Sequence, residues 1–252
     1  MTLLALDTLT ARRGPCLVLD AVSLTIGAGE CVGLIGPNGA GKTTLMRAAL
    51  GLMPATGHSS LAALNRQARA RAVAWLPQNR EIAWPVSVEQ IVTLGRAPHL
   101  APGQQPGPED RAAVETAMAE MGLTAFRQRA STRLSGGEQA RVLIARALAQ
   151  DTPLIMADEP GAGLDPANQI ALMSLFARLA TRGRAVLTAM HDLGLAARHC
   201  TRLLVLHQGR LVADGPPRAV LTPALLAQVF GITAHFADGP DGPVFQPLQV
   251  IA

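Results

Sequence analysis

Tyrosine is absent from the 252 residues, and the other aromatic side chains are few: five phenylalanines and two tryptophans. Lysine occurs only once, as Lys42, although arginines are spread along the whole chain. A lysine is a compact point charge on a thin stem, whereas an arginine ends in a broad planar fork. The single lysine therefore indicates a tight backbone loop that needs a positive charge and has no room for a guanidinium.

Long hydrophobic runs are also missing, because no stretch approaches the roughly 18 to 20 consecutive apolar residues of a membrane-spanning helix. The first residues, MTLLALDTLTARRG, carry Asp7 within their apolar part and no basic residue before it. We expect a strand there rather than a signal peptide, and hence a protein that stays in the cytosol. The three cysteines, Cys16, Cys31 and Cys200, are odd in number and widely spaced, so we expect small buried residues rather than disulfides or a metal site.

The charge balance is only mildly basic, with a formal net charge of +4. A basic balance can accompany nucleic-acid binding. Here the arginines are dispersed, and the densest group, Arg66, Arg69 and Arg71, fits one solvated face of a helix. We therefore expect no nucleic-acid partner.

Short apolar runs alternate along the chain with segments of helical character. Strands are predicted at 31–35, 72–77, 153–158 and 184–190, and helices at 43–50, 111–121, 136–149, 167–182 and 193–199. This alternation favours an α/β fold with a largely parallel sheet and helices on its faces. Residues 202–215 predict a hairpin that turns at Gln208–Gly209, and the Gly- and Pro-rich segment 95–110 predicts an irregular connection.

The segment GPNGAGKT at 36–43 fits the phosphate-binding pattern G-x-x-x-x-G-K-[ST], between a predicted strand and a predicted helix. Its glycines let successive backbone N–H groups converge on phosphate oxygens, and the helix N-terminus adds its positive end. Lys42 would bridge the β- and γ-phosphates, and Thr43 would give its hydroxyl to Mg²⁺. The predicted nucleotide-binding residues of this loop are Gly36, Asn38, Gly39, Ala40, Gly41, Lys42, Thr43 and Thr44.

The segment LIMADEP at 154–160 supplies two carboxylates at the end of a buried strand. Ligands of open α/β sheets bind at such carboxyl ends. Asp158 would face Mg²⁺, and Glu159 would orient and deprotonate a water molecule. The chain is therefore predicted to bind a nucleoside triphosphate together with magnesium.

A second Gly-rich turn, LSGGEQ at 134–139, has no lysine and no evident ligand in its own chain. It resembles the signature motif of ATP-binding cassette (ABC) proteins. Gln78 in WLPQ, GLDP at 163–166 and His191 in AMHD match further family motifs in the same order, so the resemblance covers essentially the whole chain. It implies one ABC-type P-loop NTPase domain over 1–252. Such a domain has a RecA-like, mostly parallel sheet core, an N-terminal antiparallel β subdomain, a helical subdomain inserted at about 80–150, and here a short C-terminal tail at about 216–252.

The resemblance also implies how the second turn is used. Two copies of an ABC cassette pair head to tail, and each ATP lies between the phosphate loop of one copy and the signature motif of the other. The signature residues predicted to contact this ATP are Ser135, Gly136, Gly137 and Glu138. By the same resemblance, Gln78 would contact Mg²⁺ or the attacking water, His191 would hold the γ-phosphate, and Asp165 would contact the opposite subunit. The segment GAGLDP departs from the family by lacking the Ser-Ala or Thr-Ser that often precedes Leu-Asp.

The segment VSVEQIVTLGRAPHL at 86–100 and the tail at 221–236 and 244–248 resemble cassettes of importers for ferric siderophores, haem and cobalamin. This implies an ATP-hydrolysing subunit on the cytoplasmic face of the inner membrane, bound to permease subunits and linked through them to a substrate-binding protein. We expect Arg96 and His99 on the surface that receives the permease.

Three alternatives remain at the level of sequence. One is a soluble ABC ATPase of iron–sulfur assembly, DNA or ribosomes, which usually has a coiled-coil insert or a second cassette. Another is an importer subunit for other cargo, such as metal ions. The third is a nucleotide-binding regulator without hydrolysis, against which the presence of both Glu159 and His191 argues.

The adenine contact departs from the family pattern. ABC proteins usually stack the base on an aromatic residue, most often tyrosine, but the first aromatic residue of this chain is Trp75. The equivalent segment, 9–24, puts Arg13 near that place, or Arg12 if the loop length differs. A guanidinium can lie flat on a base. The alternative is that Arg13 is only a solvated loop residue.

Overall fold

The computed structural model describes residues 1–78, 82, 85–240 and 242–251. Within this described part, six strands form the central sheet in the order β5-β6-β7-β3-β8-β9. Neighbouring strands from β5 to β8 are parallel, and β9 is antiparallel to β8. The strands are β3 (Cys31–Ile35), β5 (Val73–Leu76), β6 (Leu154–Asp158), β7 (Ala185–Ala189), β8 (Arg202–His207) and β9 (Arg210–Gly215). The predicted α/β architecture is confirmed.

Both faces of this sheet are covered, and for that reason its strands are continuous apolar runs rather than alternating ones. In β3, Cys31 and Ile35 belong to the hydrophobic cluster on one face, whereas Val32 and Leu34 belong to the cluster on the other. The hairpin between β8 and β9 turns at Gln208–Gly209, whose φ angles of 49° and 79° suit a tight two-residue turn.

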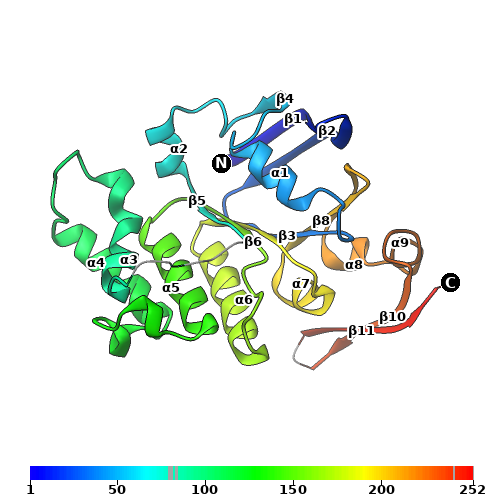
Figure 1. Cartoon of the computed structure of the whole chain (residues 1–252). Helices are drawn as coiled ribbons and strands as arrows, with labels where there is room; N and C mark the ends of the chain where they lie inside the picture. Colours follow the sequence, from blue (N-terminus) through cyan, green and yellow to red (C-terminus); the bar gives the residue numbers. More distant parts are fainter. Residues whose placement is uncertain (79–81, 83–84, 241, 252) are drawn as a thin grey trace.

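One face of the sheet carries the antiparallel subdomain and the first helix (Figure 1). In the described chain three strands form this subdomain, in the order β2-β1-β4. These elements are β1 (Thr2–Arg13), β2 (Cys16–Gly27), β4 (Thr56–Ser59) and α1 (Lys42–Ala49). The N-terminal residues form a strand, as the sequence predicted.

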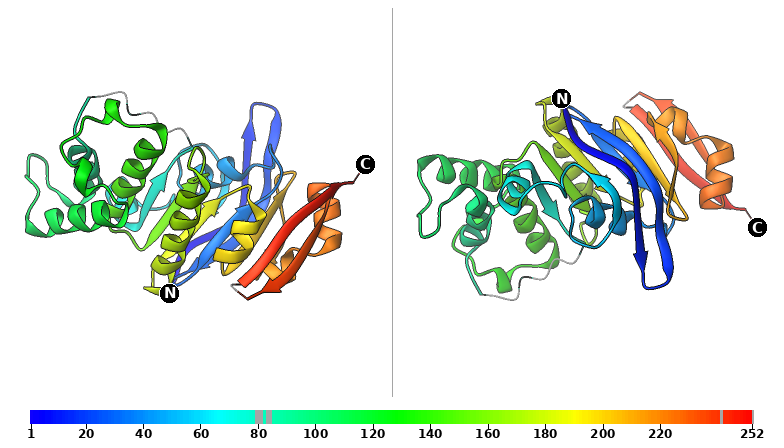
Figure 2. Two further views of the ribbon diagram at one scale, coloured as in Figure 1. Left: turned by 90° about the horizontal axis from the view of Figure 1, so that it is seen from below. Right: turned by 90° about the horizontal axis from the view of Figure 1, so that it is seen from above.

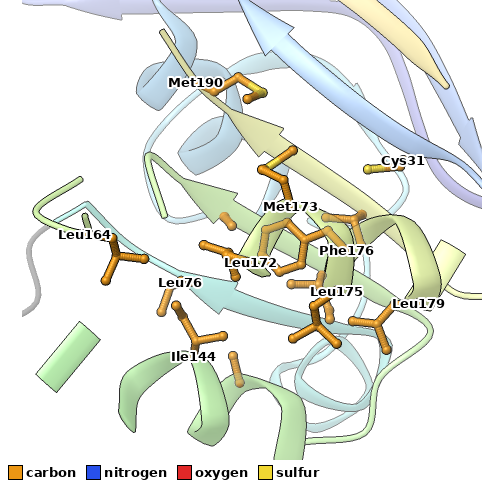
Figure 3. Packing of buried hydrophobic residues seen from close by; sticks show 14 of the residues in the cluster. Cys31, Leu76, Ile144, Leu164, Leu172, Met173, Leu175, Phe176, Leu179 and Met190 are labelled. Atoms are coloured by element: carbon orange, nitrogen blue, oxygen red, sulfur yellow. The ribbon is translucent and has the colours of Figure 1, made fainter. Parts of the chain in front are cut away.

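The opposite face packs against α6 (Pro166–Thr181) and α7 (Leu193–His199). Figure 3 shows side chains of α6, among them Met173, Phe176 and Leu179, gathered with residues of the strands in this cluster. Phe176 is only 1% exposed and is among the largest fully buried side chains.

The helical elements between β5 and β6 lie together at one end of the molecule, and the C-terminal tail lies at the other end (Figure 2). The helical elements are α3 (Val88–Thr93), the 3₁₀ helix η1 (Leu94–His99), α4 (Pro108–Glu120), the 3₁₀ helices η2 (Thr124–Phe126) and η3 (Ser131–Arg133), and α5 (Gly136–Ala149). A short α2 (Arg66–Ala72) precedes β5. The sequence prediction of an irregular connection over 95–110 is wrong at both ends, because η1 and the start of α4 are regular.

The tail folds back onto the core through its last hairpin, which packs on α7 and buries Phe245 to 9% exposure. Its elements are α8 (Pro217–Val220), α9 (Pro223–Leu225), the π-helical η4 (Leu226–Phe230), β10 (Ile232–Gly239) and β11 (Gly242–Val250). Among the described residues, none of the helices combines the length and apolarity required to cross a membrane.

Two sequence predictions about individual side chains need correction. Cys31 and Cys200 are buried as expected, but Cys16 is exposed because it opens β2 at the tip of the β1–β2 hairpin. Arg96 is only 7% exposed, so it does not lie on a docking surface. Its Nε contacts Asp110 Oδ1 at 2.8 Å, and its Nη1 donates to the carbonyl oxygen of Ala149 at 2.8 Å.

The neighbours of Arg96 in η1 are also directed toward α5. His99 Nε2 lies 2.7 Å from the carbonyl oxygen of Gln150, which ends α5. A Cβ on Gly95 would lie 2.2 Å from the carbonyl oxygen of Arg146, so only glycine permits this close approach. The segment therefore anchors the C-terminal end of α5.

Candidate functional site

The loop over 36–41 joins β3 to α1 and has the backbone that the phosphate-binding pattern requires. Gly36 has a φ of 150°, and a Cβ there would lie 2.1 Å from the carbonyl oxygen of Leu206. Gly41 adopts a left-handed conformation and caps α1 with no side-chain hydrogen bond. The N-terminal N–H groups of α1 therefore stay available to an anion, as in helix N-termini that bind phosphates.

Lys42 is the charged group of this loop and is only 6% exposed. Its Nζ donates to the carbonyl oxygens of Gly36, at 2.8 Å, and Pro37, at 3.1 Å. Burial lowers the pKa of Lys42, while the nearby carboxylates Glu159 and Asp158 act in the opposite direction. The ammonium group thus lies inside its own loop, close to both acids.

Asp158 ends β6 and is 1% exposed. Burial raises the pKa of its carboxyl group, and a hydrogen bond from the Thr43 hydroxyl partly offsets this effect. Two of the three residues predicted to ligate the metal, Asp158 from β6 and Thr43 from α1, therefore meet in the structure.

Glu159 lies between the two other residues that the sequence assigned to catalysis. The Gln78 amide Nε2 donates to Glu159 Oε2 at 2.9 Å, and His191 Nε2 lies 2.5 Å from Glu159 Oε1. The three side chains come from the ends of β5, β6 and β7, which are neighbours in the sheet. Each oxygen of the Glu159 carboxylate thus has a partner, and the Glu159 side chain is still 19% exposed.

The backbone of Glu159 is strained. Its φ of 49° is unusual for a residue that is not glycine and costs on the order of 1–3 kcal/mol. The N–H of Glu159 donates to the carbonyl oxygen of Ala189 at 3.1 Å, which ties it to the end of β7. In this conformation the carboxylate contacts His191.

The signature turn forms the N-terminus of α5. Ser135 is the N-cap: its side chain accepts from the Glu138 N–H at 3.3 Å, and Glu138 Oε2 accepts from the Ser135 N–H at 2.7 Å. These hydrogen bonds to Ser135 lower the pKa of Glu138. Ser135 and Gly136 are exposed, so the open end of α5 faces solvent. In the views of Figures 1 and 2, α5 lies apart from α1, so the structure does not bring the signature turn to the phosphate loop of its own chain.

Arg13 and Arg12 lie at the tip of the β1–β2 hairpin, and both are exposed. Arg13 pairs with Cys16 across the turn, whereas Arg12 Nη1 donates to the carbonyl oxygen of Pro15 at 3.0 Å. The hairpin does run beside the phosphate loop: a Cβ on Gly41 would lie 3.0 Å from the carbonyl oxygen of Val18. Sequence reasoning missed this contact of Val18. A backbone carbonyl in an ordinary strand requires no particular side chain, so no sequence motif indicates it.

A parallel α/β sheet with a glycine-rich loop, a buried lysine and paired acids at its carboxyl end defines a P-loop nucleoside triphosphatase. Comparison with known proteins narrows this class. The sequence profile of the ABC transporter family matches residues 19–162. The hemin import ATP-binding protein HmuV of Nocardia farcinica is 44% identical over 95% of this chain and 86% of its own length. The cobalamin import ATP-binding protein BtuD of Halobacterium salinarum is 43% identical over 89% of this chain, which spans only 57% of that protein.

Solved structures agree with the sequence comparison. A metal-chelate type ABC transporter in an inward-facing conformation has a TM-score of 0.85 at 26% identity, covering 99% of this chain and 98% of its own. A dimeric ATP-binding cassette with bound ADP and Pi has a TM-score of 0.74 at 27% identity, covering 85% of this chain and 99% of its own. The chain belongs to the ABC transporter family and is an ATP-hydrolysing cassette of it.

Proposed function

We propose that this cassette powers an importer for iron chelates, haem or cobalamin, using two copies of the chain bound to permease subunits at the cytoplasmic face of the inner membrane. The observation that carries the catalytic part is the position of Glu159 between Gln78 and His191. The names of the relatives support the importer part, since they import hemin and cobalamin.

ATP would lie on the phosphate loop. The N–H groups of residues 38–44 and the N-terminus of α1 surround its phosphates, and Lys42 exchanges its contacts with Gly36 and Pro37 for phosphate oxygens. The lysine is already buried and therefore pays little further desolvation when an anion arrives.

The donor set beside the loop fits Mg²⁺. This ion prefers oxygen ligands and is usually held by one or two carboxylates together with substrate phosphates and water. Asp158 and Thr43 already share a hydrogen bond at this place. Gln78, whose Nε2 donates to Glu159, would supply its amide oxygen. When bound, Mg²⁺ would neutralise charge on the β- and γ-phosphates.

Hydrolysis needs a group that orients a water molecule and takes its proton, and Glu159 has the position for that role. The contacts with Gln78 and His191 fix its carboxylate before ATP arrives. His191, whose side chain is 46% exposed, would hold the γ-phosphate. Residues Ser135, Gly136, Gly137 and Glu138 of the partner copy would close the site, with the N-terminus of α5 directed at the γ-phosphate.

Transport can be tested in the cells that produce the chain. Deletion of its gene should abolish growth on haem as the sole iron source, and the wild-type chain, but not Glu159→Gln, should restore it. A tagged chain should also be recovered from membranes with a polytopic protein. Recovery only from the soluble fraction would contradict the importer assignment, whereas normal growth on haem with a cobalamin or siderophore defect would select that cargo among the three proposed.

Adenine binding gives a second test, because Arg13 is exposed at the tip of the hairpin beside the phosphate loop. If its guanidinium stacks on the base, Arg13→Ala should weaken ATP binding several-fold, since an exposed cation–π contact contributes about 0.5–1 kcal/mol. Arg13→Tyr should retain or tighten binding. Titration of the isolated chain with ATP and GTP measures this, and an unchanged ATP affinity in both Arg13→Ala and Arg12→Ala would refute the contact.

A further inference from the structure

Two glutamines bind the backbones of two different loops in the same way. Gln169 Nε2 donates to the carbonyl oxygens of Gly161, at 3.2 Å, and Leu164, at 3.1 Å. These acceptors lie eight and five residues before the glutamine. The amide of Gln169 therefore joins the two ends of the loop over 161–164.

Gln139 repeats this arrangement in the signature turn. Its Nε2 donates to the carbonyl oxygens of Ser131, at 3.3 Å, and Leu134, at 3.4 Å, which again lie eight and five residues before it. Each glutamine follows a helix N-cap, which is Ser135 for α5 and Asp165 for α6. In both cases a glutamine in the first turns of the helix binds the loop that precedes that helix.

The loop over 161–164 has little packing of its own to fix its shape. Its first two residues, Gly161 and Ala162, line a cavity of about 240 Å³ together with Gln169. Ala162 and Gly163 are exposed, and only Leu164 is buried. Two backbone hydrogen bonds hold the loop from within, from the Ala162 N–H to the carbonyl oxygen of Glu159 and from the Leu164 N–H to that of Gly161. The amide of Gln169 adds the side-chain hydrogen bonds that tie this backbone to α6.

The two cross-linked loops also lie side by side. A Cβ on Gly137 would be 3.8 Å from Leu164 Cδ2 and 3.9 Å from the carbonyl oxygen of Gly163. In the proposed dimer, Ser135 and Asp165 both face the partner copy. A shift in one loop would therefore change the surface offered by the other.

We propose that Gln139 and Gln169 are positioning residues that hold the signature turn and the 161–164 loop in the shape required to close the partner's ATP site. The inference rests on the proposed head-to-tail dimer. A glutamine NH₂ group has two donor hydrogens, enough for two carbonyl acceptors. An ionised glutamate has nearly the same shape but no donor, so it would lose both side-chain hydrogen bonds and face the two carbonyl oxygens with negative charge.

The test measures ATP-dependent dimerisation in a Glu159→Gln background, with Gln169→Glu and Gln139→Glu added separately. Each is expected to weaken the dimer about tenfold, because in both copies the loop that closes the partner's site loses the two hydrogen bonds of its glutamine. ATP affinity of the monomer should stay at the background value. Gln67→Glu, on the exposed surface of α2, is the matched control and should change nothing.

Gln169→Lys tests the chemistry of the cross-link, since its ammonium group can donate to both carbonyls. It should dimerise more tightly than Gln169→Glu. Wild-type dimerisation by both glutamate variants would overturn the inference, and so would a parallel loss of monomer ATP binding in all three variants. If the Glu159→Gln chain itself stays monomeric with ATP, the proposed dimer fails and this inference with it.

Discussion

Replacement of Glu159 by glutamine is expected to lower ATP turnover by roughly 100- to 10,000-fold, the range contributed by a general base. ATP binding should survive, because the phosphate loop, Lys42 and Asp158 are unchanged. The glutamine side chain has the same shape and keeps one acceptor oxygen for Gln78 or His191. It cannot take a proton from water, so ATP should persist and hold two copies of the chain together.

Steady-state turnover and gel filtration with ATP and Mg²⁺ measure the two effects separately. Glu109→Gln, on the exposed first turn of α4, is a matched control and should hydrolyse ATP as the wild type does. A Glu159→Gln chain that stays monomeric and hydrolyses ATP at the wild-type rate would contradict both the catalytic role and the dimer.

The sequence predicted the catalytic cluster because strand ends in a parallel sheet converge. Glu159 and His191 each follow a continuous apolar run, and Gln78 follows a third. Such runs are buried on both faces, and their carboxyl ends meet at one edge of the sheet. The sheet order β5-β6-β7 then makes these three ends neighbours, which no local pattern could establish by itself.

The expectation that Arg96 lies on the permease surface came from the family resemblance, and it was wrong because Arg96 binds partners within its own chain. A Gly- and Pro-rich segment usually indicates a surface loop. Here the guanidinium instead contacts Asp110 and the end of α5, with the acceptor at Ala149 lying 53 residues away. The contact with Asp110, aided by the Gly107 N–H, lowers the pKa of that carboxyl group. Tertiary contacts of this kind decide whether an arginine binds a partner or its own chain.

The glutamine cross-links were also beyond sequence reasoning. Gln139 lies inside the signature motif and Gln169 follows GLDP, but a glutamine near a helix N-terminus has no single expected role. Only the distances to the carbonyl oxygens show that both side chains bind the preceding loop. The departure of GAGLDP from the usual family residues is consistent with a loop whose shape is held by Gln169 rather than by hydroxyl side chains within it.

Mixing two inactive variants is expected to restore ATP hydrolysis. Lys42→Ala removes the charge of the phosphate loop, whereas Ser135→Arg blocks the open N-terminus of α5. Each pure variant has the same defect in both sites of its dimer and should lose about 10²–10³-fold in turnover, as expected when a donor to the transition state is lost. In a mixed dimer one site carries both defects and the other carries neither.

Recovery depends on whether Ser135 acts on the ATP of the opposite copy. If it does, random pairing at equal concentrations should return up to about a quarter of the wild-type rate, since half of the dimers are mixed and each has one intact site. If Ser135 acted on the ATP of its own chain, every site in the mixture would contain at least one defect and no activity would return. Turnover of the mixture against each variant alone separates the two arrangements, and a pure Ser135→Arg chain with wild-type turnover would remove the role of Ser135 altogether. The exposed Ser135 and Gly136 at the start of α5, set apart from α1, favour action on the opposite copy.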